Sequence, residues 1–315
     1  QQQGVPADVA ELVFSQLLAF GGYSFAKSHA AAFAVLVYQS AWLKKYHPAI
    51  FFTALLNNQP MGVWNAAVLV NEIPRPGLLG LPIDIHRSQD ICTVEEGGIR
   101  LGLNYVKNLK EEHISRILAA RDEAAYDSLF GFSRRTKIPR SSIENLIIAC
   151  GMDGWGLPRR QLLWELGTLH VQEEGLDLEY APQEVKLPEQ TIAEAMLAEQ
   201  EIMGLSPGDH VMTLYRARLD ERGIVGSRAL GQCASGQRAA AAGLLVVHQA
   251  PPTAKGFRFL TLEDEDGMIN VIVRPKIYGR YQKIIRTSRL LLVSGTVQQE
   301  TGVTNLLAQS IAPLH

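Results

Sequence analysis

The spacing of apolar side chains indicates that the chain begins with helices. Up to Asn57, apolar residues recur three and four positions apart, which is the period of a helix that buries one face. The clearest series is Val9, Leu12, Val13, Leu17 and Phe20. Gly21-Gly22 breaks this helix, and the pattern then predicts helices over Ala30–Tyr46 and Ala49–Asn57, which His47-Pro48 separates.

The middle of the chain is predicted to be a connector followed by further helices. Residues 59–98 are rich in Pro and Gly, which exclude a long helix and favour a connector with short strands. Residues 100–167 show helical periodicity in pieces of about ten residues, joined by turns that contain Gly. An acidic linker follows over Val171–Lys186, and then a helix over Thr191–Ile202, which Gly204 ends as a C-cap.

From Leu244 onward the pattern changes to the alternation typical of β-strands. Strands are expected at 244–247, 257–262, 268–273, 290–297 and 305–311, with a helix at 275–285. The acidic run from Glu263 to Gly267 is expected to be a solvated hairpin turn. Three strands, a helix and two strands, in that order, are typical of an OB-fold, a five-stranded barrel that binds oligonucleotides in many proteins.

The composition fits a protein of two or three domains with sizeable cores. The chain has 315 residues, 47% of them hydrophobic, and no apolar run reaches the roughly 20 residues that a membrane span needs. Its three cysteines, Cys92, Cys150 and Cys233, lack the spacing of a zinc site and fit a reducing cytosol. Because the chain begins with Gln1 and has no signal-peptide pattern, we expect a piece of a longer, cytoplasmic protein.

The net charge of −2 averages over segments of opposite sign. Residues 171–205 contain nine acids and one Lys, net −8, whereas residues 236–315 contain nine Lys plus Arg and five acids, net +4. Residues 101–170 contain ten bases and eight acids, net +2. An acidic joint thus separates two mildly basic blocks, and basic blocks can face a polyanion.

The start of the second predicted helix carries the first candidate binding residues. Lys27, Ser28 and His29 stand there, followed by a run of alanines that lets other groups approach closely. Helix N-terminal amides and a nearby Lys suit a phosphate group. The plainer interpretation is an N-cap with an alanine-rich packing face, since caps occur at every helix.

The segment around these residues resembles a known family. The run GYSFAKSHAAAFAVLVYQSAWLKKYHPAIFFTALLN resembles the late fingers segment of C-family bacterial DNA polymerases, the family of the DNA polymerase III α-subunit. That family carries G-Y-x-F-x-K-S-H and then Y-Q-x-x-[WF]-L-K. Asn57–Gly62 and Gly204–His210 are similar to the error-prone, damage-tolerant branch. The resemblance covers nearly the whole chain, and it implies that Lys27, Ser28 and His29 lie near the incoming nucleotide or the template.

Two segments of residues 100–170 are identified as a tandem helix-hairpin-helix, whose hairpins point backbone N–H groups at a phosphate. In the first, Asn108 and Lys110 stand where the family has glycines. Asn tolerates positive φ and Lys does so poorly, so this hairpin is expected to bind DNA weakly or only to pack. In the second, Gly151 is expected to supply the turn, and Arg159 and Arg160 add charge. The plainer alternative is a helical domain with solvated arginines.

The predicted barrel offers a third candidate surface. The residues expected to hold a nucleic-acid backbone are Lys255, Arg258 and Arg274. The residues that can stack on bases are Phe257, Phe259 and Tyr278. The shared parity of Phe257 and Phe259 favours the alternative that both face the core and that Arg258 faces outward.

These segments give an α+β multidomain fold class. The expected segments are a helical end of the fingers at 1–58, a connector at 59–99, a tandem helix-hairpin-helix domain at 100–170, an acidic linker and helix at 171–235, and an OB-fold at 236–315. The resemblance implies that the chain is the C-terminal, DNA-holding part of a polymerase of the error-prone branch. The catalytic Asp residues and the Mg²⁺ ions of such an enzyme belong to the palm, upstream of this chain.

We therefore expect no catalytic residue and no metal site, and a chain that is inactive by itself. Asp264-Glu265-Asp266 is the only D-x-D pattern and lies in the wrong domain. The expected partners are primer–template duplex, single-stranded template, dNTP in the whole enzyme, and accessory translesion or sliding-clamp proteins, with no membrane. Three alternatives stay open: a piece of a replicative polymerase, a stand-alone DNA-binding repair adaptor, and a module whose OB-fold binds protein.

Overall fold

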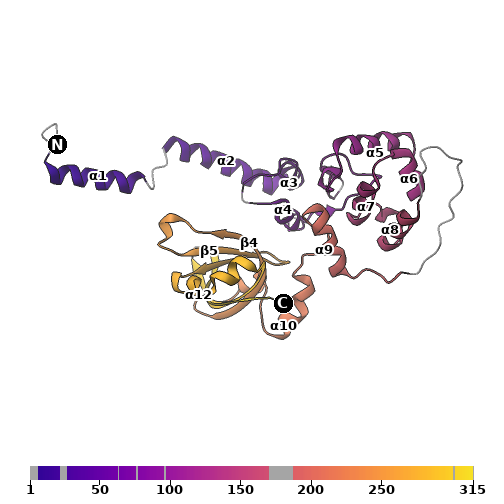
Figure 1. Ribbon diagram of the computed structural model, residues 1–315. Coiled ribbons are helices and arrows are strands. Elements are labelled where there is room, and N and C mark those ends of the chain that lie inside the picture. The colour runs from indigo at the N-terminus through magenta and orange to yellow at the C-terminus, as the bar shows by residue number, and fades with distance from the viewer. Residues whose placement is uncertain are drawn as a thin grey trace.

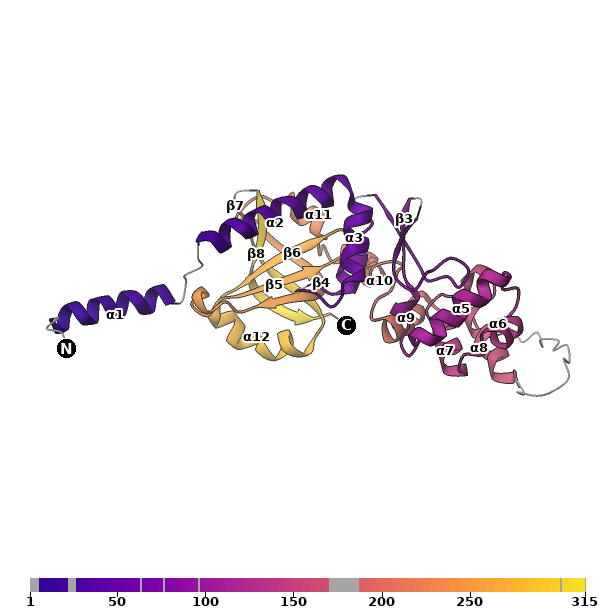
Figure 2. The same cartoon turned by 90° about the horizontal axis from the view of Figure 1, so that it is seen from above.

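The chain folds into a helical part and a β-barrel, and two N-terminal helices run out from the helical part on the side where the barrel lies (Figure 1). The computed structural model describes residues 6–21, 27–62, 64–75, 77–95, 97–169, 187–300 and 302–314. The predicted acidic linker over Val171–Lys186 lies outside these residues. Figure 2 places the helical part beside the barrel, with α9 (Ile192–Met203) and α10 (Thr213–Glu221) between them.

The N-terminal helices follow the predicted pattern. α1 (Ala7–Gly21), α2 (Lys27–Tyr46) and α3 (Pro48–Asn57) correspond to the three expected helices. α3 begins with Pro48, which suits the first helical position because the N–H there needs no partner in the helix. α3 buries Phe52 and Leu56 in the core of the helical part, whereas no described side chain of α1 or α2 is buried.

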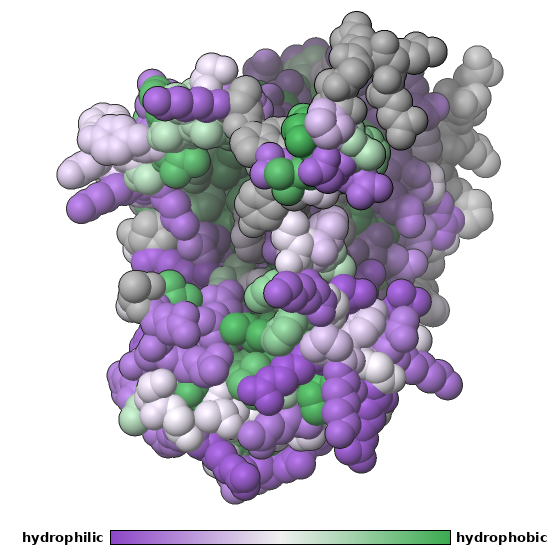
Figure 3. Space-filling model, turned by 90° about the vertical axis from the view of Figure 1, so that its left-hand side faces the viewer, coloured by the Kyte–Doolittle hydropathy of each residue, from purple (hydrophilic) through white to green (hydrophobic). Residues whose placement is uncertain are grey.

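Instead, α1 and α2 expose many large apolar side chains. Those with the largest exposed fractions are Phe14 at 63%, Leu17 and Leu18 at 64%, Val37 at 65% and Tyr38 at 72%. Figure 3 shows hydrophobic residues among polar ones on the face where these helices lie. A helix that is apolar on all sides is normally buried, and contiguous exposed apolar surface marks an interaction site. These two helices therefore have the composition of interface elements.

The connector contains a helix that the Pro-rich pattern did not predict. α4 (Ala66–Glu72) begins where the Asn65 side chain accepts a hydrogen bond from the N–H of Val68 at 3.1 Å, and it ends before Pro74. The prolines thus limit the helix to seven residues without preventing it. The expected short strands are present as a three-stranded sheet in the order β1 (Leu79–Leu81), β3 (Gly98–Arg100), β2 (Thr93–Glu95).

Short helices follow the sheet, as their periodicity predicted. They are η1 (Leu103–Tyr105), α5 (Glu111–Glu123), α6 (Leu129–Thr136), α7 (Arg140–Ile148), η2 (Asp153–Trp155) and α8 (Arg159–Thr168). One hydrophobic core joins them to α3, α4, the small sheet and α9, from Phe52 to Leu205. α9 ends at Gly204 with φ of 71°, the left-handed C-cap that the sequence predicted.

The C-terminal part is a closed five-stranded barrel, which confirms the predicted OB-fold. Its strands are β4 (Arg238–Gln249), β5 (Arg258–Glu263), β6 (Met268–Val273), β7 (Leu290–Glu300) and β8 (Val303–Pro313). The strand order is β4-β5-β6-β8-β7, in which β6 and β8 are parallel and the other described pairs are antiparallel. α12 (Pro275–Thr287) lies between β6 and β7 in the chain and packs on the barrel core.

Two further helices join the helical part to the barrel. α10 and α11 (Ser227–Leu230) lie in a stretch for which the sequence predicted only one helix, α9. α10 contributes Leu219 to a small core with Met212, Ala242 of β4 and Leu314. α10 is therefore packed against the barrel, and its polar sequence gives little periodic signal of this.

Candidate nucleic-acid interface

The first hairpin precedes α5, and its residues Lys107, Asn108 and Lys110 are exposed. Asn108 has φ of 63°, the left-handed conformation that the family obtains from glycine. Lys110 has φ of −72°, so its side chain causes no backbone strain. Glu111 and Glu112 in the first turn of α5 suit the helix dipole but repel a phosphate. The hairpin geometry is thus present without glycine, with charges of both signs beside it.

The second hairpin depends on two different residues for its turn. The left-handed residue is Cys150, with φ of 68°, and not Gly151, to which the sequence had assigned the turn. Gly151 is needed because a Cβ there would lie 2.9 Å from the carbonyl oxygen of Leu146. Gly151 is buried and its N–H donates to that same oxygen at 2.8 Å, so this N–H is already used within the protein.

Arg159, at the start of α8, is held by two carboxylates. Its guanidinium donates to Asp153 at 2.6 Å and to Glu199 of α9 at 2.7 Å. Glu199 is buried and also accepts from Ser206 Oγ at 2.5 Å and Cys150 Sγ at 3.3 Å. Burial and the nearby Glu199 raise the pKa of the Cys150 thiol. Arg159 therefore has a structural role in joining α8 to α9.

Arg160 also contacts the segment around α9. It donates to the carbonyl oxygens of Pro188 and Glu189 at 2.9 and 3.4 Å and pairs with Glu194 at 3.0 Å. Since the arginines of the second hairpin have partners within the chain, the exposed Lys107 and Lys110 of the first hairpin are better placed to meet a phosphate.

The alternate side chains of β5 face the opposite way to the one that we predicted. Leu260 and Leu262 face the core, while Phe259 faces outward with 37% of its surface exposed. The prediction that Phe259 faces the core and Arg258 faces outward is therefore wrong, because the even positions of this strand supply two buried leucines and the half-buried Arg258 shares their parity. Phe257 is half-buried and precedes the strand. Phe259 lies opposite Ile272 on β6, on the outer face of the two strands with which OB-folds bind oligonucleotides.

The basic candidates of the barrel gather at the end where α12 begins. Arg258 lies over the ring of Tyr278, with 4.7 Å from the guanidinium carbon to the ring centroid. Tyr278 is buried and is thus a support for Arg258, not a platform for a base. Lys255, with φ of 47°, and Arg274, at the N-cap of α12, are both exposed.

Lys27, Ser28 and His29 form the first turn of α2 and are exposed. The His29 ring lies 4.4 Å from the Phe33 ring, one helical turn on. The position at the N-terminus of a 20-residue helix is the one that the resemblance implies for a phosphate contact.

The acidic turn between β5 and β6 is not solvated, so that prediction is wrong. Glu263 and Asp264 are 0% and 1% exposed, because cationic and polar groups of neighbouring elements enclose them. Glu263 accepts a hydrogen bond from Asn71 of α4 at 3.2 Å and lies 3.7 Å from both Arg75 and His210. The turn therefore joins the barrel to the connector.

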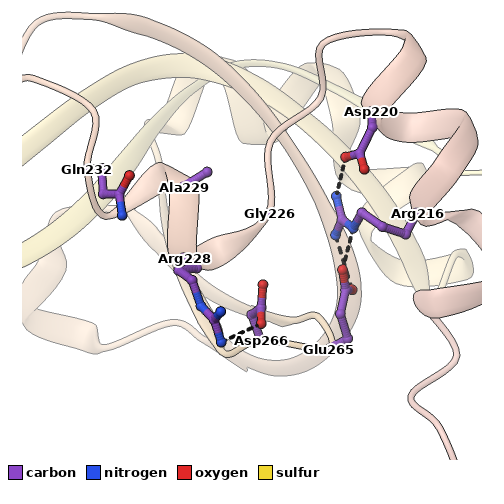
Figure 4. Close-up of a pocket in the computed structure, with 8 residues that line it drawn as sticks. All are labelled: Arg216, Asp220, Gly226, Arg228, Ala229, Gln232, Glu265 and Asp266. Carbon is purple, nitrogen blue, oxygen red and sulfur yellow. Dashed lines mark hydrogen bonds and ion pairs between the residues drawn. The ribbon is translucent and has the colours of Figure 1, made fainter.

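A hollow of about 330 Å³ lies beside this turn (Figure 4). Arg216 of α10 pairs with Asp220 one turn along the same helix and with Glu265 of the β5–β6 turn, and Arg228 of α11 pairs with Asp266 at 2.9 Å. Because each of its charged groups is paired with another, this hollow has the character of a joint between α10, α11 and the barrel.

No group of three or more His, Cys, Asp or Glu side chains is placed to hold a metal ion within the described ranges. Among the same residues, no helix combines the length and the apolar character that crossing a membrane requires.

The chain matches one family model and a set of curated proteins. A family model described as a helix-hairpin-helix motif matches residues 77–162, which include both hairpins. The error-prone DNA polymerase of Burkholderia pseudomallei is 39% identical over 327 residues, covering 99% of this chain and 30% of that protein. The error-prone DNA polymerase of Corynebacterium efficiens is 37% identical over 313 residues, covering 99% and 29%. The chain thus spans less than a third of the length of these relatives.

Among solved structures, part of the chain is similar to asparaginyl-tRNA synthetase from Pyrococcus horikoshii. The TM-score is 0.25 at 17% identity, over 28% of this chain and 22% of that one. The S. pombe Stn1–Ten1 complex gives a TM-score of 0.22 at 20% identity, over 24% and 57%.

Proposed function

The chain belongs to the error-prone DNA polymerase family and corresponds to the C-terminal portion of its members, and we propose that it is the part that holds the DNA. We assign residues 1–58 to the end of the fingers, residues 100–170 to duplex binding, and residues 236–315 to the single-stranded template. The relatives that match over 99% of the chain carry the name of the error-prone branch, which favours that branch over a replicative polymerase.

The observation that carries this proposal is the first hairpin. Asn108 adopts the left-handed φ that a phosphate-binding hairpin requires, although the expected glycine is absent. Exposed Lys107 and Lys110 flank it and supply positive charge. This arrangement suits contacts to phosphate, which give affinity without choice of sequence.

The exposed helices α1 and α2 support a place within a larger enzyme. Their apolar side chains need cover, and the relatives are more than three times as long as the aligned chain. We propose that the palm and the remaining fingers of the parent polymerase cover them. Lys27, Ser28 and His29 then lie where α2 meets the active site, near the phosphates of the incoming dNTP.

The chemistry of nucleotide addition belongs to the rest of the parent enzyme in this proposal. Two-metal phosphoryl transfer needs a set of carboxylates around Mg²⁺, and the described residues provide no such set. The contribution of this chain is to position primer and template. Accessory translesion or sliding-clamp proteins are further candidate partners of the parent.

A DNA titration tests the proposal. We expect the purified chain to bind both primed duplex and single-stranded DNA in a fluorescence anisotropy assay at about 50 mM salt, and to bind much more weakly at about 200 mM. The steep salt dependence is expected because each phosphate contact releases counterions. Absence of binding at the lower salt concentration would favour an OB-fold that binds protein. It would exclude both the DNA-holding part of a polymerase and a stand-alone DNA-binding repair adaptor.

Replacing Phe259 with Ala should specifically weaken binding of single-stranded DNA. A stacked base contributes about 1–3 kcal/mol in such folds, so the dissociation constant should rise by about 5- to 150-fold. The fold should tolerate the change because the ring is outward-facing. Trp164→Ala is the matched control, because Trp164 is 48% exposed on α8, outside the barrel. Equal effects of the two variants would contradict a role for Phe259 in stacking.

A further inference from the structure

A row of positive side chains along α12 is not used by the function proposed above, apart from Arg274. Residues 267–299 contain six bases and no acid. The bases, which we call the α12 stripe, are Arg274, Lys276, Arg280, Lys283, Arg286 and Arg289. All six are exposed. The side of the barrel where α12 lies in Figure 1 is mostly hydrophilic in Figure 3.

Four residues of the stripe, Lys276, Arg280, Lys283 and Arg286, lie within α12 on the face that points away from the barrel, while Arg274 precedes the helix and Arg289 follows it. The residues of α12 that pack on the barrel core are Ile277, Tyr278, Tyr281, Ile284 and Ile285. Lys276, Arg280 and Lys283 follow one another at spacings of four and three, which places them on one side of the helix. The rise from Lys276 to Arg286 is about 15 Å. A strand of B-DNA has a phosphate about every 3.4 Å along its axis, so the stripe has the length of about four phosphates.

The charges of the stripe have no carboxylate partner in the part of the chain that the structure describes. Among the described residues, none of the six forms an ion pair with a carboxylate, whereas Arg216 and Arg228 on the other side of the barrel do. Arg280 lies over the ring of its neighbour Tyr281, at 5.4 Å. A protein that only needs a soluble surface normally mixes charges of both signs. A single-sign row indicates attraction of a polyanion.

The stripe is continuous with the basic candidates of the barrel. A Cβ at Gly256 would lie 3.3 Å from the ring of Pro275, so the loop that carries Lys255 touches the start of α12. Arg258 pairs in register with Val273, immediately before Arg274. On β4, burial and then the nearby Arg258 and Arg286 lower the pKa of His248.

We propose that the α12 stripe binds the phosphates of single-stranded DNA and extends the path of the strand from Phe259 past the end of the barrel. This inference rests on the proposed function, because the strand must first be held by β5 and β6. DNA is favoured over an acidic protein because the stripe adjoins the outer face of β5 and because four of its six bases are Arg, which matches phosphate geometry.

The test compares oligonucleotides of two lengths on the whole chain. A variant with Lys276→Gln, Arg280→Gln, Lys283→Gln and Arg286→Gln is titrated with oligo-dT of about 4 and about 16 nucleotides, the range of site sizes of OB-folds. We expect the 16-mer to bind at least tenfold more weakly than to the wild type at low salt. The slope of log K against log salt should become shallower by about 0.7 for each phosphate that the variant no longer neutralises. Binding of the 4-mer should not change.

A control variant removes the same number of charges elsewhere, through Lys45→Gln, Arg87→Gln, Arg222→Gln and Arg228→Gln, all at exposed positions. If both variants weaken binding of the 16-mer equally, the effect comes from net charge and not from the stripe, and the inference is overturned. If Phe259→Ala weakens binding of both oligonucleotides while the stripe variant binds like the wild type, the proposed function stands and the stripe is only a solvated face. Binding of polyglutamate but not of oligo-dT by the wild type would overturn both and indicate an acidic protein partner.

Discussion

Replacing Arg159 with Ala should lower the free energy of unfolding of the helical part by about 3 kcal/mol, the range for breaking a buried ion pair. The cause is Glu199, which is buried and would lose the guanidinium that now donates to it at 2.7 Å. The partners that remain, Ser206 Oγ and Cys150 Sγ, are neutral. Urea denaturation followed by circular dichroism measures the loss.

Two neighbouring variants separate this structural role from DNA binding. Arg160→Ala should cost less than about 1 kcal/mol, because the carboxylate that it pairs with is solvent-exposed. The loss of stability in Arg159→Lys should lie between those of Arg159→Ala and Arg160→Ala. Lysine keeps the charge but loses the planar fork that reaches Asp153 and Glu199. A stable Arg159→Ala variant with weakened DNA affinity would assign Arg159 to the DNA-binding surface instead.

The elements of this fold follow from periodicity, and the sequence therefore predicted most of them. The alternation in 257–273 and the helical period in 275–285 placed β5, β6 and α12 within two residues of their observed positions. α4 was not predicted, because the signal for it is a capping interaction of Asn65 among prolines that suggest irregular structure. Local patterns thus predict the order of the elements, whereas capping hydrogen bonds decide where the shortest helices form.

The orientation of side chains depends on contacts that no local pattern records. Parity alone could not decide whether Phe259 or Leu260 faces the core, since both are apolar and a shift by one residue exchanges them. The acidic turn is buried because Asn71 and Arg75, from a segment about 190 residues earlier in the chain, pack against it. The α12 stripe, in contrast, is visible in the sequence as a run of bases without acids, a signal that segment averages conceal.

Replacing Asp264 with Ala should lower the free energy of unfolding of the barrel by about 2–3 kcal/mol, the range for hydrogen bonds to a buried charged group. The Asp264 carboxylate accepts four hydrogen bonds. The donors are Ser227 N and Ser227 Oγ, both at 2.6 Å, and the N–H groups of Asp266 at 3.0 Å and Gly267 at 2.9 Å. Ala would leave these donors without a partner, and it would separate the β5–β6 turn from the start of α11.

The turn itself provides the matched control. Asp266→Ala removes the same side chain two residues on. Among the residues that the structure describes, Asp266 pairs only with Arg228, which is 75% exposed, so the cost should stay below about 1 kcal/mol. Asp264→Asn should have an intermediate effect, because the amide oxygen can still accept from Gly267 while the amide nitrogen faces the N–H of Ser227. If Asp264→Ala and Asp266→Ala unfold at the same urea concentration, the buried Asp264 carboxylate does not hold the turn to α11. The joint must then rest on its other contacts, which are those of Glu263, the Arg216–Glu265 pair and the apolar packing of α10 on the barrel.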